Sequence, residues 1–350
     1  MRATAVLTVR NEGAFLIEWL AHHRGIGFTD FVVFSNDCED GTDAMLDRLE
    51  EMGELHHIRN DGPYDEAGIQ FTALKIADKH PAVRKADWLL ALDIDEFVNI
   101  HVGDHTLEAL LGALPDADAI TLTWRLFGNG GLVRFRDGPV TAQFTKAAPE
   151  VMYWPWRAFM FKTLYRNNGS YKKLGVHRPR APVNGRVQAT KWWDGQGRAL
   201  DNRFQKQGIF SAYGRENYGL VQLNHYPLGA MESYIVKRDR GRAVHADHAL
   251  GLDYWTERNW CVEEDVSIRA CDALRDPHLQ RLRADETLLA RHKAAAAWRG
   301  TRYNDLMLDE ENRALMGRLM MAPPARPVPL KYAIELIKFG QAGMKAPSSN

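Results

Sequence analysis

The first hundred residues alternate between short apolar runs and longer segments with a helical period. In the longer segments, apolar residues recur every three or four positions, as they do on one face of a helix. The apolar runs lie at residues 5–9, 31–34, 55–58 and 88–92, and the periodic segments at residues 15–23, 45–52 and 69–77. Strands that alternate with helices predict a parallel sheet with right-handed crossovers. We therefore expect an α/β fold with a Rossmann-like, mostly parallel sheet flanked by helices.

Acidic residues follow the fourth apolar run, Trp88–Leu92. Asp93 and Asp95 are two positions apart, so their side chains can share one face of an extended chain. Neighbouring carboxylates are poorly tolerated unless a cation or a proton neutralises them. A hard divalent ion that is also bound by a diphosphate fits this pattern, so Asp93 and Asp95 are candidate metal ligands. A solvated turn or a helix N-cap is the alternative interpretation.

Polar residues also follow the first and second predicted strands, so three groups of polar residues stand at strand ends. The three groups are Asn11 and Glu12, then Asn36, Asp37 and Asp40, and finally Asp93 and Asp95. Because the carboxyl ends of parallel strands lie at one edge of the sheet, these groups should converge there. Asp37 can accept hydrogen bonds from a base or a ribose, while Asp93 and Asp95 bind the metal and the phosphates. The sequence contains neither Gly-x-Gly-x-x-Gly nor Gly-x-x-x-x-Gly-Lys-Ser/Thr, which excludes the two commonest phosphate loops as motifs.

The helical period disappears between residues 127 and 214, where glycines, aromatic residues and basic residues accumulate. We expect irregular strands and long loops that form an acceptor-side region. Trp154, Trp156 and Trp192 can bind the apolar faces of sugar rings, although each can equally anchor a loop to the sheet. His177 is a candidate donor or acceptor contact, with a structural histidine as its alternative.

Charge, cysteine content and hydropathy restrict the class of protein. Lys plus Arg and Asp plus Glu both number 45, so no overall basic field indicates nucleic-acid binding. Cys38, Cys261 and Cys271 lack metal-ligand spacing and are too few for a disulfide framework, which predicts a reducing cytoplasmic location. No apolar run is long enough to span a bilayer, so we expect a soluble protein with at most peripheral membrane contact, possible at the inner face of the membrane.

Three stretches resemble the nucleotide-sugar half of a bacterial family 2-type glycosyltransferase with the A-type glycosyltransferase fold. They are residues 8–12 with 18–20, residues 35–42 and residues 92–97. The last resembles the Asp-x-Asp element that binds Mn²⁺ or Mg²⁺ and the donor diphosphate. The middle one resembles the loop near the nucleoside, but Asn-Asp-Cys-Glu replaces its usual residues, which leaves the base preference open. The resemblance implies metal-dependent transfer from a nucleotide sugar, expected to be a UDP-sugar, to a glycan or another hydroxyl acceptor. Surface polysaccharide or glycoconjugate synthesis is the expected context.

The resemblance also implies roles for residues outside the metal-binding motif. Asn11 and Glu12 should contact the donor, and His225 should complete the metal shell or contact a phosphate. The basic run that includes Lys237 and Arg238 is either a solvated helix face or a lid that binds the diphosphate.

An inverting mechanism requires a general base within reach of the acceptor hydroxyl. The resemblance implies that this base is a carboxylate from the acceptor-side region. The sequence prediction assigns this role to Asp194, with Glu96 as a weaker option that better suits a structural carboxylate.

Three parts are expected along the chain. They are a nucleotide-sugar half at residues 1–120, an acceptor-side region of the same catalytic domain at 121–250, and a helical C-terminal extension at 251–350. Within the extension, Leu330–Phe339 predicts an amphipathic helix that packs on the body or rests on a membrane surface.

Three other classes share some of these features. A haloacid-dehalogenase-like phosphatase also has Asp-x-Asp after a strand, but usually on its first strand and with a small residue at the position of Phe97. A nucleotidyltransferase would share both the sheet and the metal. A non-catalytic module that binds nucleotide sugars or glycans would keep the aromatic residues but would tolerate loss of the carboxylates.

Overall fold

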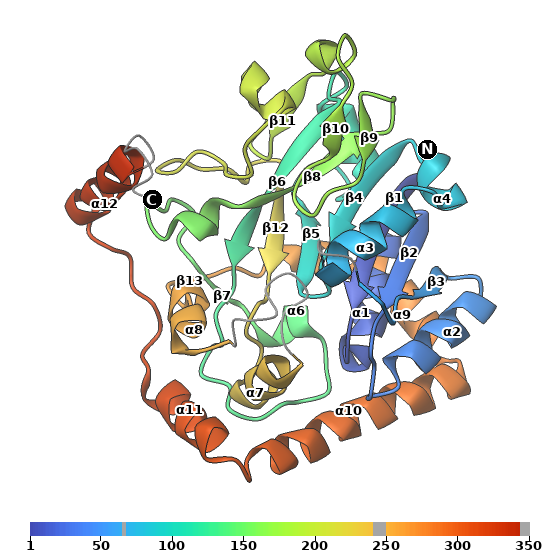
Figure 1. Ribbon diagram of the computed structural model, residues 1–350, viewed down its shortest axis with the longest axis vertical. Coiled ribbons are helices and arrows are strands. Elements are labelled where there is room, and N and C mark those ends of the chain that lie inside the picture. Colours follow the sequence, from blue (N-terminus) through green and yellow to red (C-terminus); the bar gives the residue numbers. More distant parts are fainter. Residues whose placement is uncertain (65–67, 241–249, 344–350) are drawn as a thin grey trace.

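The computed structural model describes residues 1–64, 68–240 and 250–343. Its centre is a nine-stranded sheet in the order β3-β2-β1-β4-β8-β6-β12-β5, with β11 beside β6 (Figure 1). The strands of this sheet are β1 (Ala3–Val9), β2 (Asp30–Ser35), β3 (His56–Arg59), β4 (Trp88–Leu92), β5 (Glu96–Ile100), β6 (Ala119–Leu126), β8 (Phe161–Arg166), β11 (Trp192–Asp194) and β12 (Val221–His225). Short strands outside the sheet are β7 (Lys146–Ala147), β9 (Tyr171–Lys173), β10 (Arg180–Pro182) and β13 (Glu263–Glu264).

The four strands predicted from the N-terminal pattern are all present and pair in parallel. β1 lies between β2 and β4, and β3 extends the sheet beyond β2. β8 then pairs antiparallel with both β4 and β6, while β12 runs parallel to β6 and antiparallel to β5. The predicted α/β class with a mostly parallel sheet is confirmed. The antiparallel β8 lies within the region expected to be irregular.

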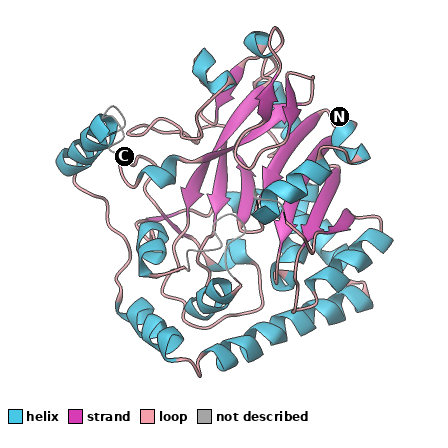
Figure 2. Cartoon of the chain, viewed as in Figure 1, coloured by secondary structure: helices cyan, strands magenta, loops and turns pink. Residues whose placement is uncertain are grey.

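Helices cover both faces of the sheet (Figure 2). They are α1 (Gly13–Gly25), α2 (Thr42–Glu51), α3 (Gly68–Ala77), α4 (Pro81–Arg84), α5 (Leu107–Ala113), α6 (Val140–Gln143), α7 (Met231–Asp239), α8 (Leu252–Arg258), α9 (Asp272–Arg283), α10 (Glu286–Leu306), α11 (Glu310–Met321) and α12 (Leu330–Gly343). Alternate residues of each central strand enter different cores, because successive side chains of a strand point to opposite faces. In β1, Ala5 and Leu7 pack with α1, α2, α9 and α10, whereas Val6 packs with α3 and α4.

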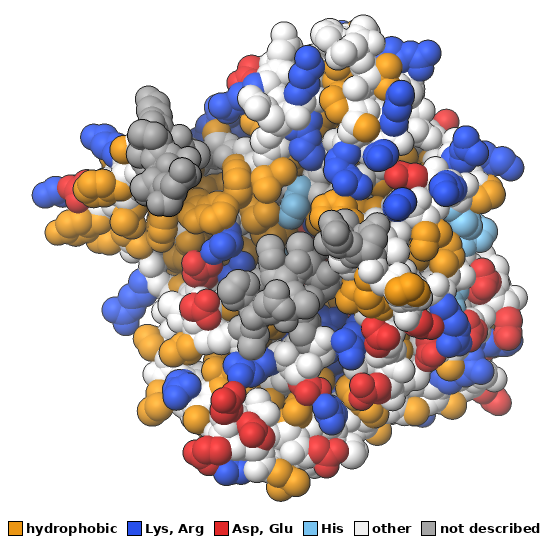
Figure 3. Space-filling view, viewed as in Figure 1, with side chains coloured by type: hydrophobic (Ala, Val, Ile, Leu, Met, Phe, Trp, Pro, Cys, Tyr) orange, Lys and Arg blue, Asp and Glu red, His pale blue; other side chains and the backbone are white. Residues whose placement is uncertain are grey.

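The C-terminal part is helical, as predicted, and α9 and α10 pack against α1 to complete one face of the sheet. α7, α8 and α11 form a separate apolar cluster. The exposed apolar side chains of α12 include Tyr332, Leu336 and Phe339. Figure 3 shows hydrophobic side chains at the left of the molecule, where α12 lies in Figure 1. None of the helices in the described segments is long and apolar enough to cross a bilayer. The division into three parts and the peripheral membrane contact stay predictions.

Candidate active site

The loops that follow β1 and β2 are joined by side chains that accept backbone hydrogen bonds. Asn11 Oδ1 accepts from the amide of Glu39 at 2.7 Å, and Asp40 Oδ2 accepts from the amide of Gly13 at 3.0 Å. Asn11 and Asp40 are both buried. Both side chains therefore hold the two loops together, and the donor contact predicted for Asn11 stays a prediction.

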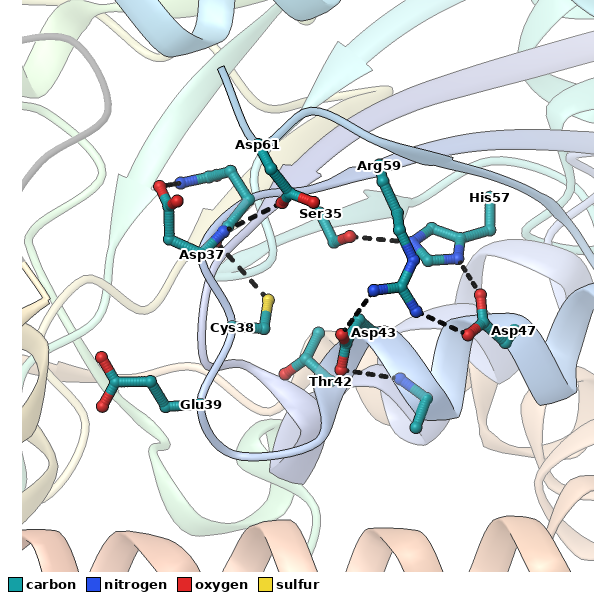
Figure 4. A network of polar contacts seen from close by, with 12 residues as sticks. Ser35, Asp37, Cys38, Glu39, Thr42, Asp43, Asp47, His57, Arg59 and Asp61 are labelled. Atoms are coloured by element: carbon teal, nitrogen blue, oxygen red, sulfur yellow. Dashed lines mark hydrogen bonds and ion pairs between the residues drawn. The ribbon is translucent and has the colours of Figure 1, made fainter. Parts of the chain in front are cut away.

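Asp37 lies at the carboxyl end of β2 and is exposed. Its Oδ2 accepts a hydrogen bond from the Tyr64 hydroxyl at 2.9 Å. Its amide donates to Asp61 at 3.3 Å (Figure 4). Burial, followed by the hydrogen bond to Asp37, raises the pKa of Tyr64 to about 12. β1 lies between β2 and β4 in the sheet. The strands that precede Asp37 and the acidic turn are therefore two strand spacings apart, or roughly 10 Å in total. The predicted convergence at one edge of the sheet is thus realised.

A second network supports this loop from below (Figure 4). Ser35 Oγ lies 2.8 Å from His57 Nε2, and His57 Nδ1 lies 2.6 Å from Asp47 Oδ1. Arg59 then joins Asp47 to Asp43 through ion pairs of 2.8 and 2.9 Å. The order of the first three groups is that of a hydrolase triad, but Ser35 is buried and offers no access to a substrate. We therefore assign the network to positioning the loop that carries Asp37.

Both carboxylate oxygens of Asp93 are occupied by protein groups. Oδ2 forms an ion pair of 2.9 Å with Lys162 Nζ, and Oδ1 accepts from Gln70 Nε2 at 3.2 Å. Lys162 is completely buried and also lies 3.5 Å from Glu96 Oε2. Burial alone would lower the pKa of Lys162, but Asp93 and Glu96 raise it above its usual value. Asp93 is therefore the counter-ion of a buried lysine, and the metal-ligand role expected from the sequence stays a prediction.

Glu96 and Trp124 form the centre of the site. Glu96 is completely buried; its Oε1 accepts from Trp124 Nε1 at 2.6 Å and its Oε2 from the amide of Asp93 at 2.8 Å. Burial raises the pKa of Glu96 to about 8. The Trp124 ring contacts the rings of His177 and His225, with centroids 5.7 and 4.3 Å away. The two histidines singled out from the sequence therefore both contact one tryptophan.

His177 is bound through only one of its ring nitrogens in the described part of the chain. Its Nδ1 lies 3.0 Å from the carbonyl oxygen of Phe161. Burial and the nearby Lys162 lower the pKa of His177 to about 4, so the imidazole is neutral at pH 7. A neutral ring that donates through Nδ1 has an acceptor at Nε2.

Asp95 points away from Asp93 and has its own basic partners. Its Oδ2 forms an ion pair of 2.6 Å with Lys237 Nζ, and its Oδ1 lies 3.7 Å from His225 Nε2. Burial raises the pKa of Asp95, but Lys237 and His225 outweigh it and hold this pKa well below its usual range. Arg238, the neighbour of Lys237, donates to the carbonyl of Leu250, and its predicted contact with the donor stays a prediction.

Asp95 and His225 are the groups that fit a divalent cation. Asp95 Oδ1 and His225 Nε2 face one another at about the distance that separates two ligands of one ion. Burial lowers the pKa of His225, which favours the neutral imidazole that binds metals. His225 Nδ1 is buried without a partner. The described residues contain no cluster of three or more His, Cys, Asp or Glu side chains arranged for a metal. The remaining ligands would have to come from a substrate, such as a diphosphate.

A cavity opens beside Asp95, between α1, α6, α7 and α10. Glu12 reaches its wall and forms an ion pair with Arg240, with Nη1 and Oε1 2.5 Å apart. Burial raises the pKa of Glu12, although Arg240 and then Arg299 act in the opposite direction. The residues with charged or polar side chains that line the cavity include Glu12, Asp95, Arg136, Gln143, Ser233, Lys237, Arg240 and Arg299.

The structure does not bring Asp194 to this site. Asp194 is buried in β11 beside Thr121, in the first half of β6, whereas His225 pairs with Leu126 at the far end of that strand. Its carboxylate forms an ion pair of 2.8 Å with Arg198 and accepts backbone hydrogen bonds from the adjoining turn. These contacts give Asp194 a structural role, and its prediction as the catalytic base is wrong.

The three predicted acceptor tryptophans differ in exposure. Trp192 is buried in the core and donates to the Tyr171 hydroxyl at 3.1 Å, so it cannot bind a sugar ring. Trp156 is 44% exposed and lies against Arg157, and Trp154 is partly buried. The acceptor contacts predicted for Trp154 and Trp156 stay predictions.

Lys162, Trp124 and Arg299 were not identified from the sequence, whereas Arg240 belongs to the basic run that begins at Lys237. One signal for Lys162 was present, because it interrupts the apolar segment Phe159–Leu164 and a lysine within a buried strand is rarely unpaired. No comparable signal marks Arg299, whose partners lie more than a hundred positions away in the chain.

The sheet with carboxylates along its carboxyl edge is accompanied by a family match over more than half of the chain. The match covers residues 7–198 and is to the family described as Glycosyltransferase family 92, so the chain belongs to that family. The family number inferred from the motifs was therefore wrong, and the phosphatase alternative is excluded. β12, α7 and α10 also contribute residues to the site, and they lie outside the matched range.

Two curated plant proteins are similar to part of the chain. A glycosyltransferase family 92 protein of Oryza sativa subsp. japonica is 28% identical over 150 residues, which is 41% of this chain and 24% of that protein. A family 92 protein of Ricinus communis is 26% identical over 143 residues, or 39% of this chain and 25% of that protein. The chain thus spans about a quarter of the length of these relatives.

Solved structures show a more distant similarity. S. aureus TarS 1–349 in complex with UDP-GlcNAc is 14% identical, with 90% of this chain and 84% of that chain covered and a TM-score of 0.32. Mycobacterium tuberculosis glucosyl-3-phosphoglycerate synthase, in complex with Mn²⁺, UDP and glucosyl-3-phosphoglycerate, is 16% identical. There 35% of this chain and 44% of that chain are covered, with a TM-score of 0.26.

Proposed function

We propose that this protein transfers a sugar from a nucleotide-sugar donor to a hydroxyl acceptor, with Mn²⁺ or Mg²⁺ between Asp95, His225 and the donor diphosphate. The observation that supports the proposal most directly is the pairing of Asp95 with His225 and Lys237 at the edge of the sheet that also carries Asp37. A UDP-sugar is the donor to test first. Cytoplasmic location and a role in surface polysaccharide or glycoconjugate synthesis stay predictions from the sequence.

Each group of the site has a chemical task in this proposal. When bound, a divalent cation offsets the negative charge that develops on the leaving diphosphate. Lys237 adds a positive charge next to Asp95, and Asp37 accepts hydrogen bonds from the nucleoside. Glu96 is too deeply buried to touch a substrate, so its task is to hold the Trp124 ring, which contacts both histidines.

His177, which also contacts the Trp124 ring, provides a hydrogen-bond acceptor atom. Since Nδ1 lies within hydrogen-bond distance of the Phe161 carbonyl, Nε2 carries the free lone pair and can accept a hydrogen bond from the acceptor hydroxyl. Its low pKa makes it a weak proton acceptor, so we assign it to orienting the hydroxyl. An inverting mechanism stays a prediction, and no carboxylate base is assigned.

A panel of nucleotide sugars tests this proposal. Purified protein is incubated with each donor and Mn²⁺ or EDTA, and the released nucleoside diphosphate is measured beside a thermal-shift assay. We expect one donor both to stabilise the protein and to release nucleotide only with metal. Stabilisation without release in the presence of a range of hydroxyl acceptors would instead favour the non-catalytic binding module. Transfer of a nucleotidyl group, with pyrophosphate as product, would favour the nucleotidyltransferase.

A further inference from the structure

Arg299 extends from the middle of α10 into the cavity beside Asp95. It is 95% buried, with 5% of its surface exposed, yet it forms no ion pair with any of the described residues. Its Nη1 makes one long hydrogen bond, 3.5 Å from the carbonyl oxygen of Asn11, and its Nε is buried without a partner. Buried arginines are rarely found without a charged partner, because the desolvated guanidinium retains strong donors.

Two aromatic rings hold the guanidinium in place. The Arg299 Cζ lies 4.7 Å from the centroid of Phe15 and 5.4 Å from that of Phe135. Cation–π contacts stabilise the charge but use none of the N–H donors. Burial lowers the pKa of Arg299, and the more distant Glu12 only partly compensates. The structure therefore fixes a guanidinium at the cavity wall while its hydrogen-bonding capacity is largely unused.

The charges around the cavity are also unbalanced. Among the described residues that line the cavity, Arg136, Lys237, Arg240 and Arg299 face two carboxylates, those of Glu12 and Asp95. Lys237 pairs with Asp95 and Arg240 with Glu12, which leaves two positive charges without a partner in the cavity. An anion of about two negative charges would balance this wall.

We propose that this cavity is a phosphate-binding site in which Arg299 is the principal ligand and Arg240 assists. The planar guanidinium suits two phosphate oxygens at once, and Arg240 lies on the same wall. The proposal rests on the proposed function for the origin of the phosphate, which is either the donor diphosphate or a phosphate group on the acceptor. Both sources share the same chemistry.

Inorganic phosphate is the probe that tests the site directly. Its binding to the full chain is measured by isothermal titration calorimetry at constant ionic strength, for the wild type and for Arg299→Gln. We expect binding to the wild type and a loss of about 10- to 100-fold in affinity in the variant, the range for a charge-assisted hydrogen bond. Arg302→Gln is the matched control, because Arg302 lies on the same helix and pairs with Asp239 at the surface. Absence of binding to the wild type, or equal affinity in Arg299→Gln, overturns the proposal.

Glu12→Gln provides a second variant in case Arg299→Gln does not fold. Removal of this carboxylate increases the positive surplus and releases Arg240, so phosphate should bind more tightly than to the wild type. Unchanged or weaker binding contradicts the proposal.

Competition with UDP then distinguishes the two sources. If phosphate and UDP exclude one another, the cavity receives the donor diphosphate; if both bind together, it receives a group of the acceptor. Failure of the proposed function would appear separately, as no nucleotide release from any donor while phosphate still binds.

Discussion

Lys162 and Asp93 form an ion pair of 2.9 Å in which the lysine is completely buried within the sheet. Lys162 comes from the antiparallel strand β8, which lies between β4 and β6, and Asp93 follows β4 directly. The pair therefore connects the first carboxylate of the acidic turn to a strand that is 69 positions away in the sequence. This contact explains why Asp93 and Asp95 serve different purposes although they are nearly adjacent.

We predict that Lys162→Met destabilises the protein by about 3 kcal/mol, because it leaves Asp93 and Glu96 without their common cation. The value lies at the low end of the range for broken buried pairs, since Asp93 retains some contact with solvent. Urea unfolding measures the change. The double variant Lys162→Met/Asp93→Asn should recover part of the loss, and a double variant that is less stable than Lys162→Met contradicts the pairing.

Asp93→Asn and Asp95→Asn should differ in metal binding. We expect Asp95→Asn to weaken Mn²⁺ binding by more than about tenfold, as loss of a ligand would. Asp93→Asn should retain most of the Mn²⁺ affinity, because both oxygens of Asp93 already have protein partners. Electron paramagnetic resonance of free Mn²⁺ in the presence of UDP measures both affinities. An equal loss in the two variants would show that Asp93 also coordinates the ion.

His22 predicts a loss of stability in acid. It is buried in α1 with Nε2 2.8 Å from the carbonyl of Val98, and burial lowers its pKa from the ordinary 6.5 to about 4. The unfolded chain therefore binds a proton at a higher pH than the folded chain. The stabilisation is present above pH 6.5 and is lost as the pH falls through 4, by up to about 3 kcal/mol.

His22→Gln keeps a hydrogen-bond donor for Val98 but cannot titrate. Denaturant unfolding between pH 7 and 4 should show a smaller loss of stability in this variant than in the wild type. His23 remains in both proteins; burial and then the neighbouring His22 lower its pKa, so the variant also relieves part of the shift at His23. Parallel stability curves for the two proteins would contradict the prediction.

The exposed Trp156 and the buried Trp192 should respond differently to alanine. Trp192→Ala removes a large core side chain and should cost about 3–5 kcal/mol of stability. Trp156→Ala should leave the melting temperature nearly unchanged and, if the ring contacts a sugar, raise KM for the acceptor. Calorimetry and acceptor kinetics separate the two effects, and an unchanged KM would remove Trp156 from the acceptor site.

The parallel half of the sheet could be predicted because each of its strands is a continuous apolar run that ends in polar residues. β8 was harder to predict, since Lys162 interrupts its apolar pattern and only a distant carboxylate makes that lysine acceptable. Lys237 and Arg238 illustrate a second limit. Neighbours on a helix point about 100° apart, so only one of them can face the site, and the sequence does not reveal which.

The C-terminal helices show a third limit of prediction. The sequence of α10 carries no recognisable motif, yet its packing against α1 and α7 places Arg299 at the cavity. The prediction for Asp194 was wrong because its aromatic and glycine-rich surroundings suggested a substrate loop. Those residues instead form a buried turn around Arg198.

The separate lysine partners of Asp93 and Asp95 also determine how the rim behaves before a substrate arrives. Each carboxylate is already neutralised on its own side of the turn, so no mutual repulsion forces the turn open in the free protein. The site is therefore preorganised, and the ordering cost that usually opposes association has been met during folding. An incoming cation then competes for Asp95 with a single ammonium group, that of Lys237. The strength of this one ion pair sets the affinity of the site for the metal.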